Sequence, residues 1–329
     1  MSEGHSVPPI FEINRPMESD DYSKLERRMG RERLDARLRK QAGKGAKLLH
    51  QGEGLFRLEQ IIPFDLIVAL GLRLSGLSPL CRRNFLDVHV VEQEWALPRL
   101  PQAFDGFRLL HLTDLHIDLD TALTSVIEKI ARETPHDAAV ITGDFRDTMG
   151  GDDKPCLREM ARITAALSPQ RWGILGNHDF LEMVSPLEAD GLPILLNEAV
   201  SIRRGAEQLW IGGIDDPHYY KTHDLIGVRS QIPSDDFCIL LSHSPETYKD
   251  VARLGFDFQL SGHTHGGQLC LPGGHPLTVP CRVKKQFISG RWSHESLRGY
   301  TSPGTGSCGV AARLNCPPEA TVHILRSAA

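Results

Sequence analysis

The sequence lacks the cysteine spacing that a disulfide framework or a thiolate metal site would need. Seven cysteines occur in the 329 residues, an odd number, and no two of them form a CxxC pair. A disulfide-stabilised fold and a zinc site built from thiolates are therefore not expected. We predict that the cysteines are small, buried side chains in a reducing compartment.

Excess positive charge and secretion signals are missing as well. The chain carries 37 Lys and Arg residues against 42 Asp and Glu residues, a net charge of −5. This balance gives no reason to expect a nucleic-acid partner. The first residues show no basic segment followed by an apolar run. We therefore expect no cleavable signal peptide and a cytoplasmic location.

A long, uninterrupted hydrophobic run is also absent. The most apolar stretch spans residues 61–80 and is interrupted by Pro63, Asp65, Arg73 and Pro79. A membrane-spanning helix needs about 20 mostly apolar residues, and each charge near its centre costs about 3 kcal/mol. A transmembrane segment is therefore not expected.

The N-terminal quarter nevertheless has a distinctive pattern. Residues 24–47 hold ten basic residues against three acidic ones. Apolar side chains recur at near-helical spacing from Leu25 to Leu38, which predicts a basic amphipathic helix that ends at Gly43 and Gly45. Residues 55–80 would form a helix that is apolar on most faces. Such a helix must be covered by the rest of the chain, by another subunit or by a membrane surface.

From about Phe85 onward, short apolar runs alternate with helical stretches and with loops rich in Asp, His, Gly and Asn. This alternation is typical of an α/β fold with a mostly buried sheet. We therefore divide the chain into an N-terminal helical extension, residues 1–84, and a main domain, residues 85–329. Strands are predicted at 87–91, 107–112, 138–142, 171–175, 208–214, 237–242, 258–261 and 320–325, and helices at 122–134 and 155–167.

Polar clusters follow five of these strands. The first contains Asp114 and His116, which are two positions apart, so both side chains lie on one side of an extended chain and can approach the same ion. In the second, Gly143 permits a tight turn before Asp144. Asp144 then projects from the carboxyl end of its strand, where α/β proteins tend to bind ligands.

The other three clusters add nitrogen ligands and an amide oxygen. Asn177 and His178 follow a third strand; an Asn oxygen can bind a hard cation, and His178 would then face the substrate. His243 ends a fourth strand. His263 and His265 form a His-x-His pair flanked by glycines, which places two imidazoles on one side.

Each cluster alone has an ordinary explanation as a turn or strand end, but together they provide ligands for two ions. They supply at least three carboxylates, one amide oxygen and four imidazoles besides that of His178. Nitrogen and oxygen ligands without thiolate suit Mn best, with Fe or Zn as alternatives. Two such ions about 3.5–4 Å apart can hold both the attacking and the leaving oxygen of a phosphoryl group.

The order Asp-x-His, Gly-Asp-x-x-Asp, Gly-Asn-His-Asp, His and Gly-His-x-His resembles the calcineurin-like metallophosphoesterase family, over residues 85–329. The resemblance implies a catalytic domain with a four-layer αββα sandwich of two mixed β-sheets flanked by helices. It also implies two divalent metal ions. One set of ligands would be Asp114, His116, Asp144 and His265, and the other Asp144, Asn177, His243 and His263.

The resemblance also implies individual roles. Asp144 would bridge the two ions, and His178 would contact the scissile phosphate, where it stabilises charge or protonates the leaving oxygen. Asp147 and Asp179 would orient metal ligands. Arg146, next to the site, is a candidate for pairing with a substrate phosphate.

A narrower resemblance lies in residues 260–268 and in the run Arg-Leu-Asn-Cys-Pro-Pro-Glu at 313–319. These runs are similar to a bacterial branch of membrane-associated phosphodiesterases and UDP-2,3-diacylglucosamine pyrophosphatases of lipid A synthesis. That similarity implies a lipid-linked phosphodiester or pyrophosphate substrate and a peripheral location on the inner membrane. A soluble phosphodiesterase of nucleotides or small diesters is the alternative. A non-catalytic scaffold is disfavoured because no expected ligand is missing.

Overall fold

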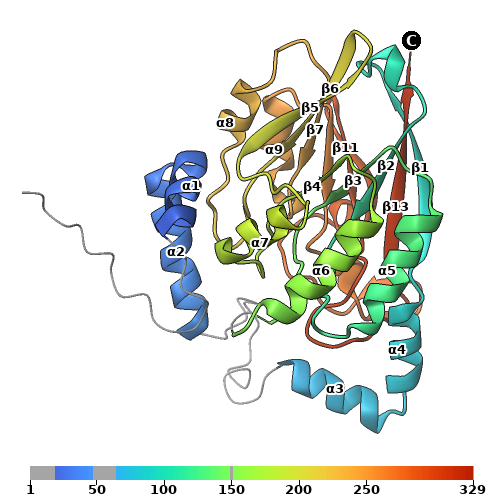
Figure 1. Cartoon of the computed structure of the whole chain (residues 1–329). Coiled ribbons are helices and arrows are strands. Elements are labelled where there is room, and N and C mark those ends of the chain that lie inside the picture. Colours follow the sequence, from blue (N-terminus) through green and yellow to red (C-terminus); the bar gives the residue numbers. More distant parts are fainter. Residues whose placement is uncertain (1–18, 47–63, 149–150, 329) are drawn as a thin grey trace, which may run out of the picture.

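The computed structural model describes residues 19–46, 64–148 and 151–328 and contains two large mixed sheets (Figure 1). The first sheet has the order β1 (His89–Leu97), β13 (Glu319–Ser327), β2 (Phe107–Leu112), β3 (Ala138–Ile141), β4 (Arg171–Gly173). The second has the order β11 (Gly290–His294), β12 (Leu297–Thr301), β8 (Phe258–Ser261), β7 (Cys238–Leu241), β6 (Glu207–Gly213), β5 (Glu198–Arg204). A separate hairpin pairs β9 (Cys270–Leu271) with β10 (His275–Pro276).

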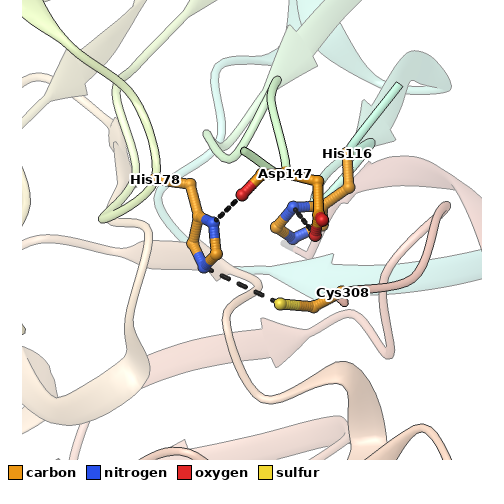
Figure 2. Close-up of side chains that lie close together, drawn as sticks. All are labelled: His116, Asp147, His178 and Cys308. Atoms are coloured by element: carbon orange, nitrogen blue, oxygen red, sulfur yellow. Dashed lines mark hydrogen bonds and ion pairs between the residues drawn. The ribbon is translucent and has the colours of Figure 1, made fainter. Parts of the chain in front are cut away.

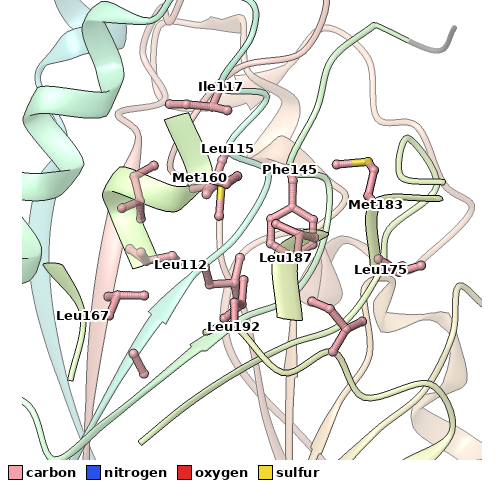
Figure 3. Packing of buried hydrophobic residues seen from close by; sticks show 14 of the residues in the cluster. Leu112, Leu115, Ile117, Phe145, Met160, Leu167, Leu175, Met183, Leu187 and Leu192 are labelled. Atoms are coloured by element: carbon pink, nitrogen blue, oxygen red, sulfur yellow. The ribbon is translucent and has the colours of Figure 1, made fainter. Parts of the chain in front are cut away.

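The central strands of both sheets are buried on both faces, so successive residues of such a strand enter different apolar layers. In β2, Leu109 packs between the sheets with Ile239 of β7. The next residue, Leu110, packs with Ile127 of α5 (Ala122–Glu133) and Met160 of α6 (Lys154–Ala166). Figure 3 shows part of this helix-side cluster. Each fully buried side chain of this size contributes about 1.5–3 kcal/mol.

The outer face of the second sheet is covered by shorter helices. Leu240 of β7 packs with Val228 of α8 (Leu225–Ser230) and Val251 of α9 (Tyr248–Arg253). The prediction of two mixed sheets flanked by helices is confirmed.

The parallel strands bring the predicted site residues to one edge. β2, β3 and β4 are parallel neighbours in the first sheet, and β6, β7 and β8 are parallel neighbours in the second. Carboxyl ends of parallel strands meet at the same edge of a sheet. The loops after these strands therefore converge where the two sheets meet.

The N-terminal helices differ from the predicted pattern. The basic segment forms α1 (Ser19–Met29) and α2 (Arg31–Ala46), so its break lies at Gly30, with φ +78°, and the prediction of an end at Gly43 and Gly45 is wrong. A glycine inside a helix costs only about 1 kcal/mol relative to alanine, so Gly43 and Gly45 do not end α2. Leu25 and Leu34 are buried in the cluster under the first sheet.

The apolar segment forms α3 (Phe64–Leu74) and α4 (Ser78–Leu86), separated by a turn at Gly76 with φ +73°. Part of the predicted apolar helix, residues 55–63, lies outside the described residues. In the three described stretches of the chain, no helix has both the length and the apolar character required to cross a bilayer. The division into residues 1–84 and 85–329 stays a prediction.

Candidate metal centre

The structure brings the predicted ligands together as two buried groups. Ligand atoms of Asp114, His116 and His265 lie within 4.8 Å of one another, and so do those of Asp144, His243 and His263. Asp144 lies between the groups, because its Oδ2 is 3.6 Å from His116 Nε2 and 3.3 Å from His243 Nε2. Asn177 Oδ1 extends the second group, at 3.1 Å from His243 Nε2.

Most of these residues have a backbone conformation that L-amino acids rarely adopt. Five of them have a positive φ: Asp114 (52°), His116 (41°), Asp144 (55°), His263 (69°) and His265 (50°). Left-handed conformations of such residues cost roughly 1–3 kcal/mol each and cluster at functional sites. The three loops after β2, β3 and β8 therefore place these side chains around a common centre at the expense of backbone strain.

Gly143 and Gly176 let two of the loops approach closely. Gly143 has a φ of +92°, and a Cβ at this position would lie 2.5 Å from the backbone nitrogen of Gly176. A Cβ at Gly176 would in turn overlap the carboxylate of Asp144. The loops after β3 and β4 can therefore meet only if both positions are glycine.

The polar atoms at this centre fit divalent cations. His116 Nε2 and His263 Nε2 are buried and have no hydrogen-bond partner among the described residues. Buried polar atoms normally have partners. Each of these nitrogens lies in a group with a carboxylate oxygen, and mixed nitrogen and oxygen donors are typical ligands of Zn, Fe and Mn.

Electrostatics favours cations at the same place. Burial disfavours the charged imidazole of His243, but the carboxylates of Asp144 and Asp114 outweigh it and raise the pKa to about 10. Burial and neighbouring histidines hold the pKa of His263 and of His265 well below the usual value, so both are neutral and offer lone pairs. The second group thus attracts positive charge.

Asp179 fixes the loop that carries Asp144. Its carboxylate accepts hydrogen bonds from the backbone nitrogens of Asp144 (2.7 Å), Phe145 (2.9 Å) and Gly176 (2.8 Å). Burial, together with the charge of Asp144, raises the pKa of Asp179 to about 6. Asp179 therefore orients Asp144 by holding the backbone of its loop in place.

His178 and Asp147 lie beside the first group (Figure 2). The backbone nitrogen of His178 donates to Asp144 Oδ1 at 2.8 Å, and its Nδ1 lies 2.8 Å from the carbonyl oxygen of Asp147. The side chain of Asp147 contacts His116, with 3.3 Å between Oδ1 and Nδ1. Cys308 Sγ is 3.7 Å from His178 Nε2, so this nitrogen is the one that faces the Cys308 loop.

Arg146 is 1% exposed, and its guanidinium lies 5.0 Å from the centre of the Phe180 ring. The Arg146 side chain therefore packs near the Phe180 ring. The prediction that Arg146 pairs with a substrate phosphate remains untested.

Two residues at the centre, Arg313 and His218, are not among the predicted site residues. Arg313 is fully buried and donates to the carbonyl oxygen of His265 at 2.9 Å. The His218 ring is centred 4.3 Å from that of His263, and its Nδ1 is 2.7 Å from Glu246 Oε2. The Asp-Asp-Pro-His run at 215–218 directly after β6 was an available signal for His218. Arg313 is the first residue of the Arg-Leu-Asn-Cys-Pro-Pro-Glu run at 313–319, but no local pattern indicates its contact with His265.

Comparisons with known proteins agree with this geometry. The family model described as calcineurin-like phosphoesterase matches residues 107–267. The uncharacterized metallophosphoesterase YkoQ of Bacillus subtilis (strain 168) is 30% identical over 255 residues, which cover 73% of this chain and 92% of YkoQ.

Two other relatives are more distant. The phosphodiesterase YaeI of Escherichia coli (strain K12) is 26% identical over 226 residues, covering 66% of this chain and 81% of YaeI. A Danio rerio transmembrane protein with metallophosphoesterase domain is 28% identical over 260 residues, covering 73% of this chain and 57% of that protein. With its ligand loops and its likeness to YkoQ, the chain belongs to the calcineurin-like phosphoesterases, a family of phosphoester hydrolases.

Proposed function

We propose that this protein hydrolyses a phosphodiester or pyrophosphate bond at a dinuclear metal centre. The position of Asp144 Oδ2, 3.6 Å from His116 Nε2 and 3.3 Å from His243 Nε2, is the observation that carries the proposal. One ion would be held by Asp114, His116, Asp144 and His265, and the other by Asp144, Asn177, His243 and His263. Two divalent ions, Mn²⁺ being the first candidate, would supply Lewis-acid activation of water and of the phosphoryl oxygens.

His178 is the proposed catalytic residue outside the ligand sets. The contact of its Nδ1 with Asp147 O orients the ring, and Nε2, which contacts Cys308 Sγ at 3.7 Å, is the nitrogen that would meet the substrate. From there it would stabilise the phosphate charge or give a proton to the leaving oxygen, a contribution of about 10²–10⁴ in rate.

This assignment separates two kinds of variant. Asn177→Ala and His263→Ala should each weaken Mn²⁺ binding, measured by metal content after dialysis. His178→Ala should cut turnover about 10²–10⁴-fold and leave metal content nearly intact. Equal metal loss in all three variants would contradict the role of His178.

We further propose that the substrate is lipid-linked and is presented at a membrane surface. The support is an apolar face on α3, formed by Leu66, Ile67, Leu70 and Leu74, which are 58%, 47%, 53% and 79% exposed. Exposed apolar faces of this kind are typical of interfacial helices. Arg73 is also exposed on α3, and a basic side chain near an anionic bilayer adds about 1 kcal/mol of attraction.

α3 begins next to the loop that contacts His178. Asp65, in the first turn of α3, lies beside Gly309, where a Cβ would be 2.4 Å from Asp65 Oδ1. Gly309 donates its backbone N–H to Asp147 Oδ1 at 2.8 Å, and its neighbour Cys308 contacts His178. A bilayer into which α3 inserts would therefore lie close to the Cys308–Gly309 loop, which contacts His178. The name of the zebrafish relative, a transmembrane protein, is in line with a membrane location.

A panel of substrates, assayed with Mn²⁺, tests both the proposed hydrolase activity and the proposed lipid-linked substrate. It contains a soluble aryl phosphodiester, a nucleotide sugar and UDP-2,3-diacylglucosamine in mixed micelles. We expect the lipid-linked pyrophosphate to have the highest kcat/KM. Rapid cleavage of the soluble diester with the lipid intact would favour the soluble phosphodiesterase, and no cleavage of any compound would overturn the hydrolase assignment.

Flotation with anionic vesicles tests the membrane part separately. The wild-type protein should float with the vesicles, and the double variant Leu70→Asn/Leu74→Asn should remain in the dense fraction. Ile226→Asn is the matched control, because Ile226 is 72% exposed on α8. Equal flotation of the double variant and the wild type would exclude α3 as the contact.

A further inference from the structure

Two cysteine side chains lie together behind the loop that carries His265. Cys270 in β9 is 2% exposed, and Cys316 in the loop before β13 is half-buried. The sulfur of Cys270 is 3.5 Å from the carbonyl oxygen of Gly266, and that of Cys316 is 3.6 Å from the same oxygen. Both sulfurs therefore face the same carbonyl oxygen.

The backbone holds the two cysteine segments beside each other. The backbone nitrogen of Cys270 donates to Leu314 O at 2.9 Å, and Asn315 Nδ2 donates to Cys270 O at 2.9 Å. The thiols therefore meet because of fixed backbone contacts on both sides.

The same sulfurs support a metal-ligand loop in a strained conformation. His265, Gly266 and Gly267 have consecutive φ values of 50°, 58° and 90°. The carbonyl oxygen of His265 accepts from Cys316 Sγ at 3.3 Å and from Arg313 Nη1 at 2.9 Å. A strained loop keeps its conformation only where its surroundings hold it. The contacts of the thiols with this loop thus help to orient the imidazole of His265.

We infer that Cys270 and Cys316 are an oxidisable thiol pair, and that their disulfide lowers the affinity of the Asp114, His116 and His265 group for its metal ion. An S–S bond is about 2.05 Å long, so its formation draws the sulfurs together. It also removes both S–H donors from the carbonyl oxygens of Gly266 and His265. Loss of contacts behind a metal ligand typically costs about 10–100-fold in metal affinity.

The oxidant is a low-molecular-weight disulfide, RSSR. The thiolate of Cys316 attacks it, an S–S bond forms between Cys316 and RS, and one RSH leaves after taking up a proton. Cys270 then loses its proton and attacks the Cys316 sulfur, which releases the second RSH. The protein loses two electrons and two protons, and RSSR is reduced to two RSH. Burial raises the pKa of the Cys270 thiol to about 11, so the half-buried Cys316 is the thiol that reacts first.

The test uses the full-length protein treated with oxidised glutathione. Peptide mapping by mass spectrometry should find a Cys270–Cys316 cross-link in the wild type and in Cys308→Ser, but not in Cys270→Ser or Cys316→Ser. Cys308→Ser is the matched control, because Cys308 is the other half-buried cysteine. Absence of the cross-link from the oxidised wild type would overturn the inference, whether or not the serine variants fold.

The effect on the metal rests on the proposed function, whereas the cross-link does not. Mn²⁺ titration of the wild type should show an affinity about 10–100-fold lower after oxidation and full recovery with dithiothreitol. Oxidised Cys316→Ser should bind Mn²⁺ as it does when reduced. A cross-link without a change in affinity would overturn the coupling to His265. Failure of the reduced protein to bind Mn²⁺ would instead count against the dinuclear centre.

Discussion

The α1–α2 pair and α3 differ in how far the rest of the described chain covers them. The α1–α2 pair is anchored by polar contacts: Arg28 bonds Glu188 at 2.9 Å and Glu198 at 2.8 Å, and Arg33 pairs with Asp224 at 2.7 Å. Four apolar side chains of α3, in contrast, are about half exposed or more. Figure 1 shows the α1–α2 pair at the left of the molecule and α3 at its lower end, next to α4.

This difference changes how the basic segment should be interpreted. A run of Arg and Lys next to an apolar stretch is typical of a membrane-binding surface. Here Arg28, Arg33 and Arg37 pair with the acidic side chains of Glu188, Asp224 and Asp215, all more than 140 positions away. The apolar part, α3, is the one that offers a surface to a bilayer. Local charge patterns cannot reveal partners that are distant in sequence.

The largest expected effect comes from Arg37, which connects α2 to the metal centre. Arg37 is fully buried, donates to the carbonyl oxygen of Asp179 at 3.1 Å, and pairs with buried Asp215 at 3.5 Å. Arg37→Met leaves the carboxylate of Asp215 buried without its cation, which costs about 3–5 kcal/mol. Urea unfolding should show this loss.

Two comparisons make the Arg37 prediction specific. Arg39→Ala, at an exposed position on the same helix, should change the free energy of unfolding by less than about 0.5 kcal/mol. Arg37→Met/Asp215→Leu, which removes both charges, should recover part of the lost stability. If Arg37→Met and Arg39→Ala are equally stable, α2 is not anchored as described.

How much of the fold was predictable depended on how uniformly each strand is buried. β2, β3, β7 and β8 are almost wholly buried, and the predicted ranges match them within one residue at each end. β5, β11 and β12 were not predicted. β5 is mostly half-exposed, and β12 includes Gly299, against which the Trp292 ring packs. Their strand conformation depends on pairing with neighbours, which no local pattern records.

The grouping of the candidate ligands was predictable for a different reason. These residues follow strands, so the position of Asp144 or His263 directly after a strand already indicates the sheet edge. Supporting residues such as Arg37 and Arg313 act through carbonyl oxygens that are distant in sequence. These contacts can be identified only in the three-dimensional structure.

The second largest effect should come from the apolar side of α2. Leu34 is fully buried in the cluster under the first sheet. Leu34→Ala should lower the free energy of unfolding by about 2–5 kcal/mol, because it removes buried methyl groups and leaves a cavity. Ile226→Ala, at a 72% exposed position, is the control and should have little effect. Thermal unfolding of both variants measures the difference, and similar melting temperatures would mean that α2 is only loosely attached.

A smaller effect is expected at Arg28. Its side chain is 23% exposed, so solvent screens its ion pairs with Glu188 and Glu198. Arg28→Ala should lower the free energy of unfolding by about 1 kcal/mol, less than Arg37→Met. The difference from the wild type should shrink in about 1 M salt, where charges beyond about 3 Å are screened. If Arg28→Ala lowers the free energy of unfolding as much as Arg37→Met does, the contribution of these arginines to stability does not depend on their solvent exposure.

The smallest effect on stability is expected on α3, and it decides whether the apolar face is open in solution. Leu74 is 79% exposed and Leu70 is 53% exposed. Leu70→Asn/Leu74→Asn should change the free energy of unfolding by less than about 0.5 kcal/mol, because the folded state hardly buries these side chains. A loss of 2 kcal/mol or more would mean that another part of the chain or a second copy covers the face. Urea unfolding at two protein concentrations separates these cases, since only a dimer contact depends on concentration. An unchanged stability together with lost flotation would assign the apolar face of α3 to the membrane, in contrast to the anchored face of α2.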